Sequence, residues 1–278
     1  MTGSIAAELM IVRKRAATWI LLGIWIALAM FFGYILPYVS APDGPEAVRQ
    51  AEIADLLPGQ LVSAVLEGVP FFGGVLVLIL GVLIMGGEYG WGTLKTLFTQ
   101  RSSRTLIVGA KLVALGIVLL GFAMATFATS ALASLVIAWL EDAPVTWPSA
   151  SLVLRGIGAT WLIFAVWAAL GVLLAAISRG TALAIGIGIL YGLVIEGLMA
   201  ALFDQISLVQ PLVEGLLRAN GYSLAATLGV STAATQENGP GMFSGPFVSG
   251  LQATLAMAAY LIAFVAITVG LIRRRDIA

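Results

Sequence analysis

The chain has 278 residues, of which 60% are hydrophobic and only 10% are charged. A soluble domain carries roughly 25% charged residues, so this composition excludes a soluble protein and indicates an integral membrane protein. Fourteen basic and fourteen acidic residues cancel, which gives no support for nucleic-acid binding. Because the chain has no cysteine and no histidine, disulfides are absent and the commonest transition-metal ligand is missing.

The N-terminal segment 1–17 is predicted to be an amphipathic helix in the headgroup region. Apolar residues recur at helical spacing from Ile5 to Ala16, whereas Glu8 and the basic run at 13–15 are polar. The apolar run at 18–36 that follows is long enough to span a bilayer. This pattern also fits a cleavable secretory signal. An uncleaved anchor is favoured, because the run exceeds a usual signal core and further spans follow.

Five further apolar runs predict an all-α membrane domain of six spans over residues 1–278. They cover residues 61–86, 108–140, 152–178, 181–203 and 247–272. The polar segment 41–60 is predicted to contain one short helix. The connection at 204–246 is predicted to hold two, at 208–217 and 222–230, broken at Pro211 and around Asn220-Gly221. Gly188 and Gly192 indicate either close helix packing, including at a dimer interface, or ordinary membrane-helix composition.

The distribution of basic residues predicts the orientation of the chain. With both termini in the cytoplasm, only Arg49, Arg155 and Arg218 lie outside, and eleven of the fourteen basic residues lie inside. The positive-inside rule selects this topology. The segment 87–107 then becomes the largest cytoplasmic feature, and 204–246 becomes an extracellular loop.

The cytoplasmic segment has the pattern of a short amphipathic helix from Tyr89 to Gln100. Trp91, Leu94, Leu97 and Phe98 share one arc, and polar residues including Gly92, Thr93 and Lys95 fill the other. Such a helix between two spans has a role at the membrane surface. The alternative is a basic loop that only determines topology.

Three ionisable residues lie in or near the apolar runs. These are Glu67, Arg155 and Glu196, all toward the outer end of their spans. A charge at mid-bilayer costs about 3 kcal/mol on insertion scales. Arg155 is therefore a candidate partner of Glu196 or Glu67, in a neutralising pair or a polar cavity. Alternatively, each side chain snorkels to the headgroups by itself.

Several chemistries have no support in the sequence. There is no phosphate-binding G-x-x-x-x-G-K-[ST] motif, no H-E-x-x-H and no G-x-S-x-G. No catalytic residue, metal site or cofactor is therefore predicted in this chain, and it does not hydrolyse ATP by the usual route.

The cytoplasmic segment resembles the signature of type-2 ABC transporter permeases. The pattern EYGWGTLKTLFTQRSSR, followed by GAKL, places an acid and a Gly-Thr pair after the second span and an Arg and a Lys before the third. The matching residues are Glu88, Gly92-Thr93, Arg104 and Lys111. The six-span plan, the amphipathic N-terminus and the helices between spans five and six extend the resemblance over nearly the whole chain.

The resemblance implies a permease subunit of a bacterial or archaeal cell membrane, without a nucleotide-binding domain. It would pair with a second permease, identical or not, and dock a separate cytoplasmic ATPase that holds ATP and Mg²⁺. The coupling element would run from Tyr89 to Gln100, with Glu88 bracing its N-terminus. Arg101 and Arg104 would contact the ATPase or, alternatively, anionic headgroups. The expected residues are Glu88, Tyr89, Gly92, Thr93, Lys95, Arg101, Arg104 and Lys111.

Type-2 permeases mostly export drugs, peptides or lipids, and that is the expectation here. Two other classes of protein stay open. The first is an ion-driven secondary transporter, which would use Glu67 and Glu196 as coupling acids; such transporters usually contain internal repeats, and none is visible in this sequence. The second is a non-transporting membrane scaffold for an ATPase.

Overall fold

The computed structural model describes residues 2–41, 46–90, 104–202, 210–230 and 247–274. The described residues form helices and no strand. The first half of the chain forms α1 (Thr2–Lys14), α2 (Ala16–Met30), η1 (Phe31–Ile35), α3 (Leu36–Ser40), α4 (Glu46–Ala54), η2 (Pro58–Gln60), α5 (Leu61–Gly68), η3 (Val69–Gly73), α6 (Gly74–Gly90) and α8 (Arg104–Leu140). The second half forms α9 (Ala150–Ser178), α10 (Ala182–Ile189), η4 (Leu190–Ile195), α11 (Glu196–Leu202), α12 (Gln210–Glu214), α13 (Leu217–Ala226) and α14 (Gly250–Arg274).

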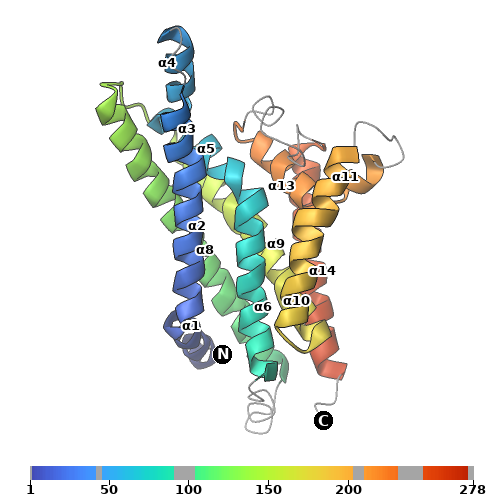
Figure 1. The fold of residues 1–278 in the computed structure, drawn as a ribbon. Helices are drawn as coiled ribbons and strands as arrows, with labels where there is room; N and C mark the ends of the chain where they lie inside the picture. Colours follow the sequence, from blue (N-terminus) through green and yellow to red (C-terminus); the bar gives the residue numbers. More distant parts are fainter. Residues whose placement is uncertain (1, 42–45, 91–103, 203–209, 231–246, 275–278) are drawn as a thin grey trace.

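Six helical stretches within the described residues are long and apolar enough to cross a membrane. They are Ala16–Ser40, Pro58–Tyr89, Thr105–Leu140, Ala150–Ser178, Ala182–Met199 and Gly250–Arg274. For the described part of the chain, the prediction of a helical protein with six candidate spans is therefore confirmed. The structure describes a multi-pass helical bundle whose N- and C-terminal helices emerge at the same end (Figure 1). We call this the terminal end, and the opposite end, which carries α4, α12 and α13, the distal end.

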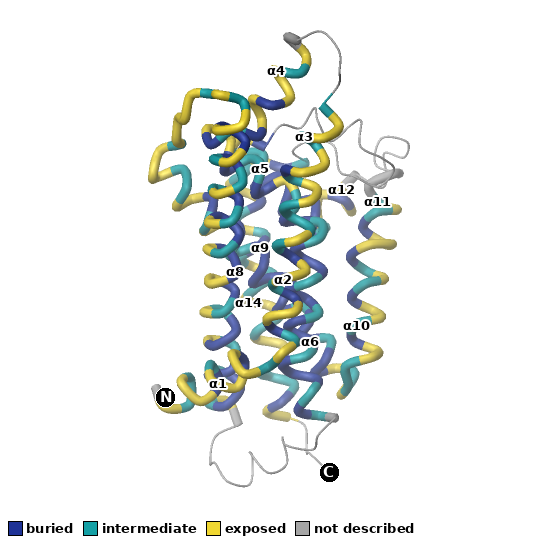
Figure 2. Tube along the Cα trace, turned by 60° about the vertical axis from the view of Figure 1, so that its left-hand side comes forward, coloured by how far each residue is buried: buried dark blue, intermediate teal, exposed yellow. Residues whose placement is uncertain are grey.

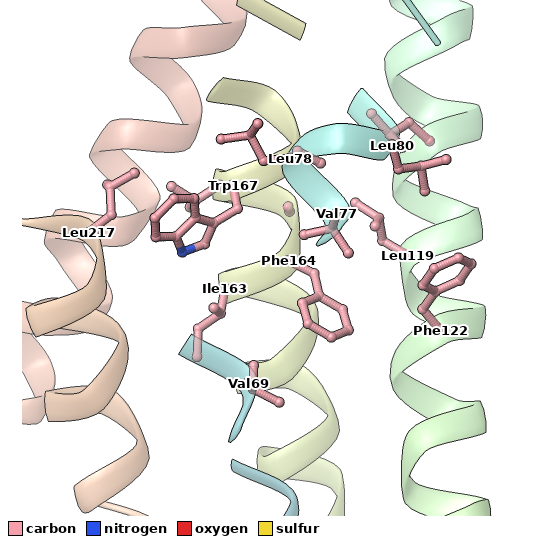
Figure 3. Close-up of a cluster of buried hydrophobic side chains, with 14 of the residues drawn as sticks. Val69, Val77, Leu78, Leu80, Leu119, Phe122, Ile163, Phe164, Trp167 and Leu217 are labelled. Carbon is pink, nitrogen blue, oxygen red and sulfur yellow. The ribbon is translucent and has the colours of Figure 1, made fainter. Parts of the chain in front are cut away.

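The second and fourth spans form the centre of the bundle. Their most apolar windows are 67% and 72% buried, against 17% for the first and sixth. Figure 2 shows the same contrast, with exposed residues along the outer helices. Large buried side chains from these central spans, among them Leu78, Phe164 and Trp167, form the core drawn in Figure 3.

Glycines allow the central helices to approach closely. A Cβ atom at Gly81 would overlap the Ala168 carbonyl of α9, and one at Gly171 would overlap the Leu78 carbonyl of α6. Gly188 and Gly192, the two glycines noted in the fifth span, also lie against other helices of the same chain. A Cβ at Gly188 would overlap Leu78, and a Cβ at Gly192 would lie 2.9 Å from Trp167. Both glycines therefore serve packing within one chain.

Helix α1 is separate from the first span because the backbone is extended at Arg15, with φ −74° and ψ 121°. Two side chains of α2 satisfy carbonyls left free at the end of α1. The Thr18 hydroxyl donates to Val12 O at 2.9 Å, and the Trp19 indole donates to Arg13 O at 2.7 Å. These bonds set the turn that lays α1 across the terminal end of the bundle.

The predicted break around Asn220-Gly221 was wrong. The predicted break at Pro211 borders residues outside the described part of the chain, and Pro211 itself lies in the first turn of α12, where proline is tolerated. Helix α13 runs through Asn220 and Gly221 without interruption. The Asn220 amide donates to the carbonyls of Glu214 and Leu216, both at 2.8 Å, and Gly221 lies against Pro70. The connection between α12 and α13 falls at residues 215–216 instead.

Candidate functional site

A buried ion cluster joins three helices at the terminal end of the bundle. The Lys111 ammonium lies 2.5 Å from a carboxylate oxygen of Glu88 and 2.8 Å from one of Glu8. All three side chains are less than 10% exposed. We call Glu8, Glu88 and Lys111 the terminal ion cluster.

Each member comes from a different element next to the predicted coupling segment. Glu8 lies in the middle of α1, Glu88 two residues before the end of α6, and Lys111 seven residues after the start of α8. Helix α1 packs along the start of α8, which brings Glu8 to Lys111. The cluster therefore links the N-terminal helix to both ends of the segment at 91–103.

The charges in the cluster do not cancel by themselves, because two carboxylates share one ammonium. Arg15 supplies positive charge nearby. Its guanidinium donates to Leu83 O at 2.6 Å, and it would lie 3.5 Å from a Cβ atom at Gly87. Removing one partner from a buried ion pair is strongly destabilising, because it leaves an uncompensated buried charge. Loss of any one member is therefore expected to destabilise the contact between α1, α6 and α8.

The other predicted coupling residues lie around this cluster. Tyr89 belongs to the last turn of α6, and Arg104 is the first residue of α8. Gly92, Thr93, Lys95 and Arg101 lie outside the described residues, as does the side chain of Arg104. The predicted helix Tyr89–Gln100 is described only at Tyr89 and Gly90, which continue α6.

A second buried polar cluster lies at the distal end. The Glu196 carboxylate accepts hydrogen bonds from the first two backbone N–H groups of α13, Leu217 N at 3.2 Å and Arg218 N at 2.8 Å. The Arg218 guanidinium donates to Gly192 O at 3.3 Å and lies 4.8 Å from the centre of the Phe71 ring. We call Glu196, Arg218, Gly192 and Phe71 the distal cluster.

Two π-helical segments shape the distal cluster. Phe71 belongs to η3 and Gly192 to η4, and Glu196 directly follows η4. Such π-turns are rare, and in helices they often occur at functional sites. Burial lowers the pKa of Arg218, while the Glu196 carboxylate acts in the opposite direction. Burial also raises the pKa of the neighbouring Tyr222 to about 12.

The structure does not bring together the three ionisable residues that the sequence suggested as a pair or cavity. Glu196 is fully buried in the distal cluster. Glu67 is exposed on α5, and Arg155 is exposed near the start of α9. The ion pairs found among the described residues do not include Arg155.

Sequence reasoning missed Glu8 and Arg218 as members of these clusters. Glu8 is the only acid in residues 1–42, and it precedes three consecutive basic residues. Arg218 stands alone between Leu216-Leu217 and Ala219. Isolated charges of this kind were a usable signal, because a single charge in an apolar context needs a partner.

The terminal ion cluster is suited to a mechanical role. Among the described residues, no group of three acidic side chains is placed to hold a metal ion. The Lys111 ammonium is occupied by two carboxylates, so it is not a free nucleophile or base. The arrangement connects the end of α6 and the start of α8 to each other and to α1.

Comparisons with known proteins identify the family of this chain. A family model described as "Protein of unknown function (DUF2705)" matches residues 20–278, and the chain therefore belongs to this family. No curated protein matches the chain significantly.

Proposed function

We propose that this member of the DUF2705 family is the transmembrane permease subunit of an ATP-driven transporter of the type-2 ABC class. It would export a drug-like, peptide or lipid substrate from a bacterial or archaeal cell. The observation that carries the proposal is the terminal ion cluster. Glu88 and Lys111, two residues of the permease-like signature, are 23 positions apart in the sequence and directly paired in space.

In the proposed mechanism, a separate ATPase binds the segment between α6 and α8 on the cytoplasmic side. The ion cluster ties the two ends of that segment to each other and to α1. A displacement of the segment would therefore move α1, α6 and α8 together, instead of bending one helix. By linkage, ATP can drive this motion only if the ATPase binds the two conformations with different affinities.

The proposal also specifies partners and orientation. Two permease subunits, identical or different, would form the transport path, and ATP and Mg²⁺ would bind to the ATPase subunits. Both termini and the segment 87–107 would face the cytoplasm, which the excess of basic residues there supports. This chain would contribute no catalytic residue and no metal ligand.

The test is purification of the tagged chain from its native host in a mild detergent. We expect an ATPase of separate sequence in equal ratio, and ATP hydrolysis by the reconstituted complex. Glu88→Gln should lower the bound ATPase or its turnover by about fivefold, since a buried charge-assisted contact is lost. Glu141→Gln is the matched control, because Glu141 also pairs with a basic residue but lies at the distal end.

The Glu141→Gln control and the ratio of ATPase to permease distinguish a wrong proposal from a variant that fails to fold. Both variants are compared by size-exclusion chromatography before ATPase activity is measured. Absence of any ATPase from the parent preparation would refute the permease assignment. Equal coupling in Glu88→Gln, Gly92→Pro and the parent would remove the role of this segment.

The alternative of an ion-driven transporter has one observation in its favour, the complete burial of Glu196. Its carboxylate is, however, bonded to two backbone N–H groups at the start of α13, which is a structural use of the charge. A preparation without ATPase whose uptake or efflux follows a proton or sodium gradient would favour this alternative. A scaffold would show the ATPase but no transport.

A further inference from the structure

An elongated groove of about 440 Å³ lies between the first and third spans in the distal half of the bundle. One wall is formed by α2, η1 and α3, and the other by α8. Its lining is almost entirely apolar and includes Ile26, Met30 and Val39 on one wall and Leu132, Ala133 and Val136 on the other. The groove is independent of both clusters described above.

The dimensions of the groove match a hydrocarbon chain. It extends along the first span from Ile26 to Val39, which is roughly 20 Å of helix. One leaflet of a bilayer core is about 15 Å thick. On the side of Ile26 nearer the terminal end, the two walls are joined, because the Trp25 indole donates a hydrogen bond to the Thr126 hydroxyl at 2.8 Å. The groove therefore begins near mid-span and continues toward the distal surface.

The groove faces the surroundings of the bundle along an apolar rim. Val39, Leu132 and Val136 are each more than half exposed. Tyr34 and Ile137 also line the groove, and both belong to a buried apolar cluster with Ile53 and Leu56. A groove between spans with an exposed apolar rim is open to lipid within the bilayer.

Polar groups stand at the distal mouth of the groove. Tyr38 lines the groove, and its hydroxyl donates to Glu141 at 2.7 Å. Arg49 donates to the same oxygen of Glu141 at 2.8 Å and keeps 42% of its side chain exposed. A guanidinium has five N–H donors, so Arg49 can hold Glu141 and still bind a phosphate.

The balance of charge at this mouth selects the headgroup. Glu141 and its neighbour Asp142 are both acidic, and Glu52 lies one turn after Arg49 on α4. Among the described residues of this region, Arg49 is therefore one cation beside three acids. A zwitterionic headgroup complements this arrangement, with its phosphate at Arg49 and its ammonium among the carboxylates, whereas a headgroup of net negative charge would be repelled.

We propose that this groove is a binding site for a zwitterionic glycerophospholipid, with one acyl chain between the first and third spans and the phosphate at Arg49. The site differs from the proposed coupling region and does not depend on an ATPase. A lipid held there would fill the space between α2 and α8 and connect them to α4.

The test measures lipid retained by the purified chain in native mass spectra. Three probes with identical acyl chains are titrated: phosphatidylethanolamine, phosphatidylglycerol and diacylglycerol. Ala133→Phe, which fills the groove, should lower retention of all three. Ala128→Phe is the matched control on the exposed surface of α8 outside the groove, and it should leave retention unchanged. Val136→Phe on the exposed rim is a second filling variant, should Ala133→Phe fail to fold.

The headgroup contact is tested by Arg49→Gln. This variant should weaken phosphatidylethanolamine binding by about tenfold, the loss expected for one charge-assisted hydrogen bond, and leave diacylglycerol unaffected. Arg155→Gln, at an exposed arginine near the distal end of α9, is its control. Phosphatidylethanolamine should bind more tightly than phosphatidylglycerol in the parent, and the reverse order would overturn the headgroup assignment. Unchanged retention in the filling variants, or a change in oligomeric state without loss of lipid, would overturn the site.

Discussion

Lys111 and Glu88 form a buried ion pair of 2.5 Å across the two helices that flank the segment at 91–103. Glu8 of α1 contacts the same ammonium at 2.8 Å. One lysine therefore connects the start of α8 to the end of α6 and to the middle of α1.

Replacing Lys111 by methionine should reveal how much the terminal ion cluster depends on its shared cation. The substitution leaves Glu8 and Glu88 buried side by side, and we expect a loss of about 3 kcal/mol in the free energy of unfolding. Detergent-titration unfolding measures this loss. Lys14→Met, at an exposed position of α1, is the control and should change the free energy by less than about 0.5 kcal/mol.

The triple variant Glu8→Gln, Glu88→Gln, Lys111→Met separates charge from packing. Because it removes all three charges together, it should recover most of the stability lost in the single variant. A single Lys111→Met variant no less stable than Lys14→Met would contradict the buried cluster.

Alanine at Gly171 should disrupt contact between the central helices. The added Cβ would overlap the Leu78 carbonyl and would lie 3.1 Å from Val82 N, and backbone atoms cannot shift as a side chain can. We expect a loss of about 1 to 3 kcal/mol in the free energy of unfolding. At Gly121 of α8 nothing lies within 4 Å, so Gly121→Ala should be neutral or stabilising. Equal effects at the two positions would show that α6 and α9 are not in backbone contact.

Removing the Glu196 carboxylate should release α13 from the bundle. The side chain satisfies the first two N–H groups of that helix and faces Arg218. Since the chain has no cysteine, Ala219→Cys provides a unique label inside α13. This position is buried in the parent and should react with a membrane-impermeant maleimide at least about tenfold faster when Glu196→Ala is added. Leu212→Cys, which is exposed in α12, is the control and should react rapidly in both backgrounds. An unchanged rate at position 219 would contradict the proposed role of the Glu196 carboxylate in holding the start of α13.

Tyr222 should make the chain sensitive to alkaline pH. Burial raises its pKa from 10.0 to about 12, so the folded chain keeps the phenol proton where the unfolded chain loses it. The free energy of unfolding should therefore be intact below pH 10 and fall between pH 10 and 12, by up to about 2.7 kcal/mol from this group. Tyr222→Phe should remove this part of the decline. The measurement is the free energy of unfolding against pH for the parent and for Tyr222→Phe. If the two curves run parallel between pH 10 and 12, Tyr222 does not contribute to the decline.

The order and approximate limits of the six candidate spans follow from the sequence, because an apolar run of about 20 residues has few alternatives to a buried or membrane-spanning helix. A helix before the first span follows from the same local pattern, but its predicted polar face does not: Glu8 is buried against α8, and Met10 and Ile11 are exposed. Predicted and observed limits differ mainly where polar residues extend a helix, as at Arg104 and Tyr89. The failed break at Asn220-Gly221 has a tertiary cause: the Asn220 amide bonds to two carbonyls, and Pro70 packs against Gly221.

The partners of the buried charges were decided only by the tertiary structure. The sequence identified Glu88, Lys111 and Glu196 as candidate site residues, but it did not indicate their partners. Glu8 lies 80 positions before Glu88, and Arg218 lies 22 positions after Glu196. Local periodicity places a residue on a face of its helix and says nothing about which distant helix covers that face. That choice depends on which helices can approach closely, and here Gly81 and Gly171 allow the backbones of α6 and α9 to come into contact.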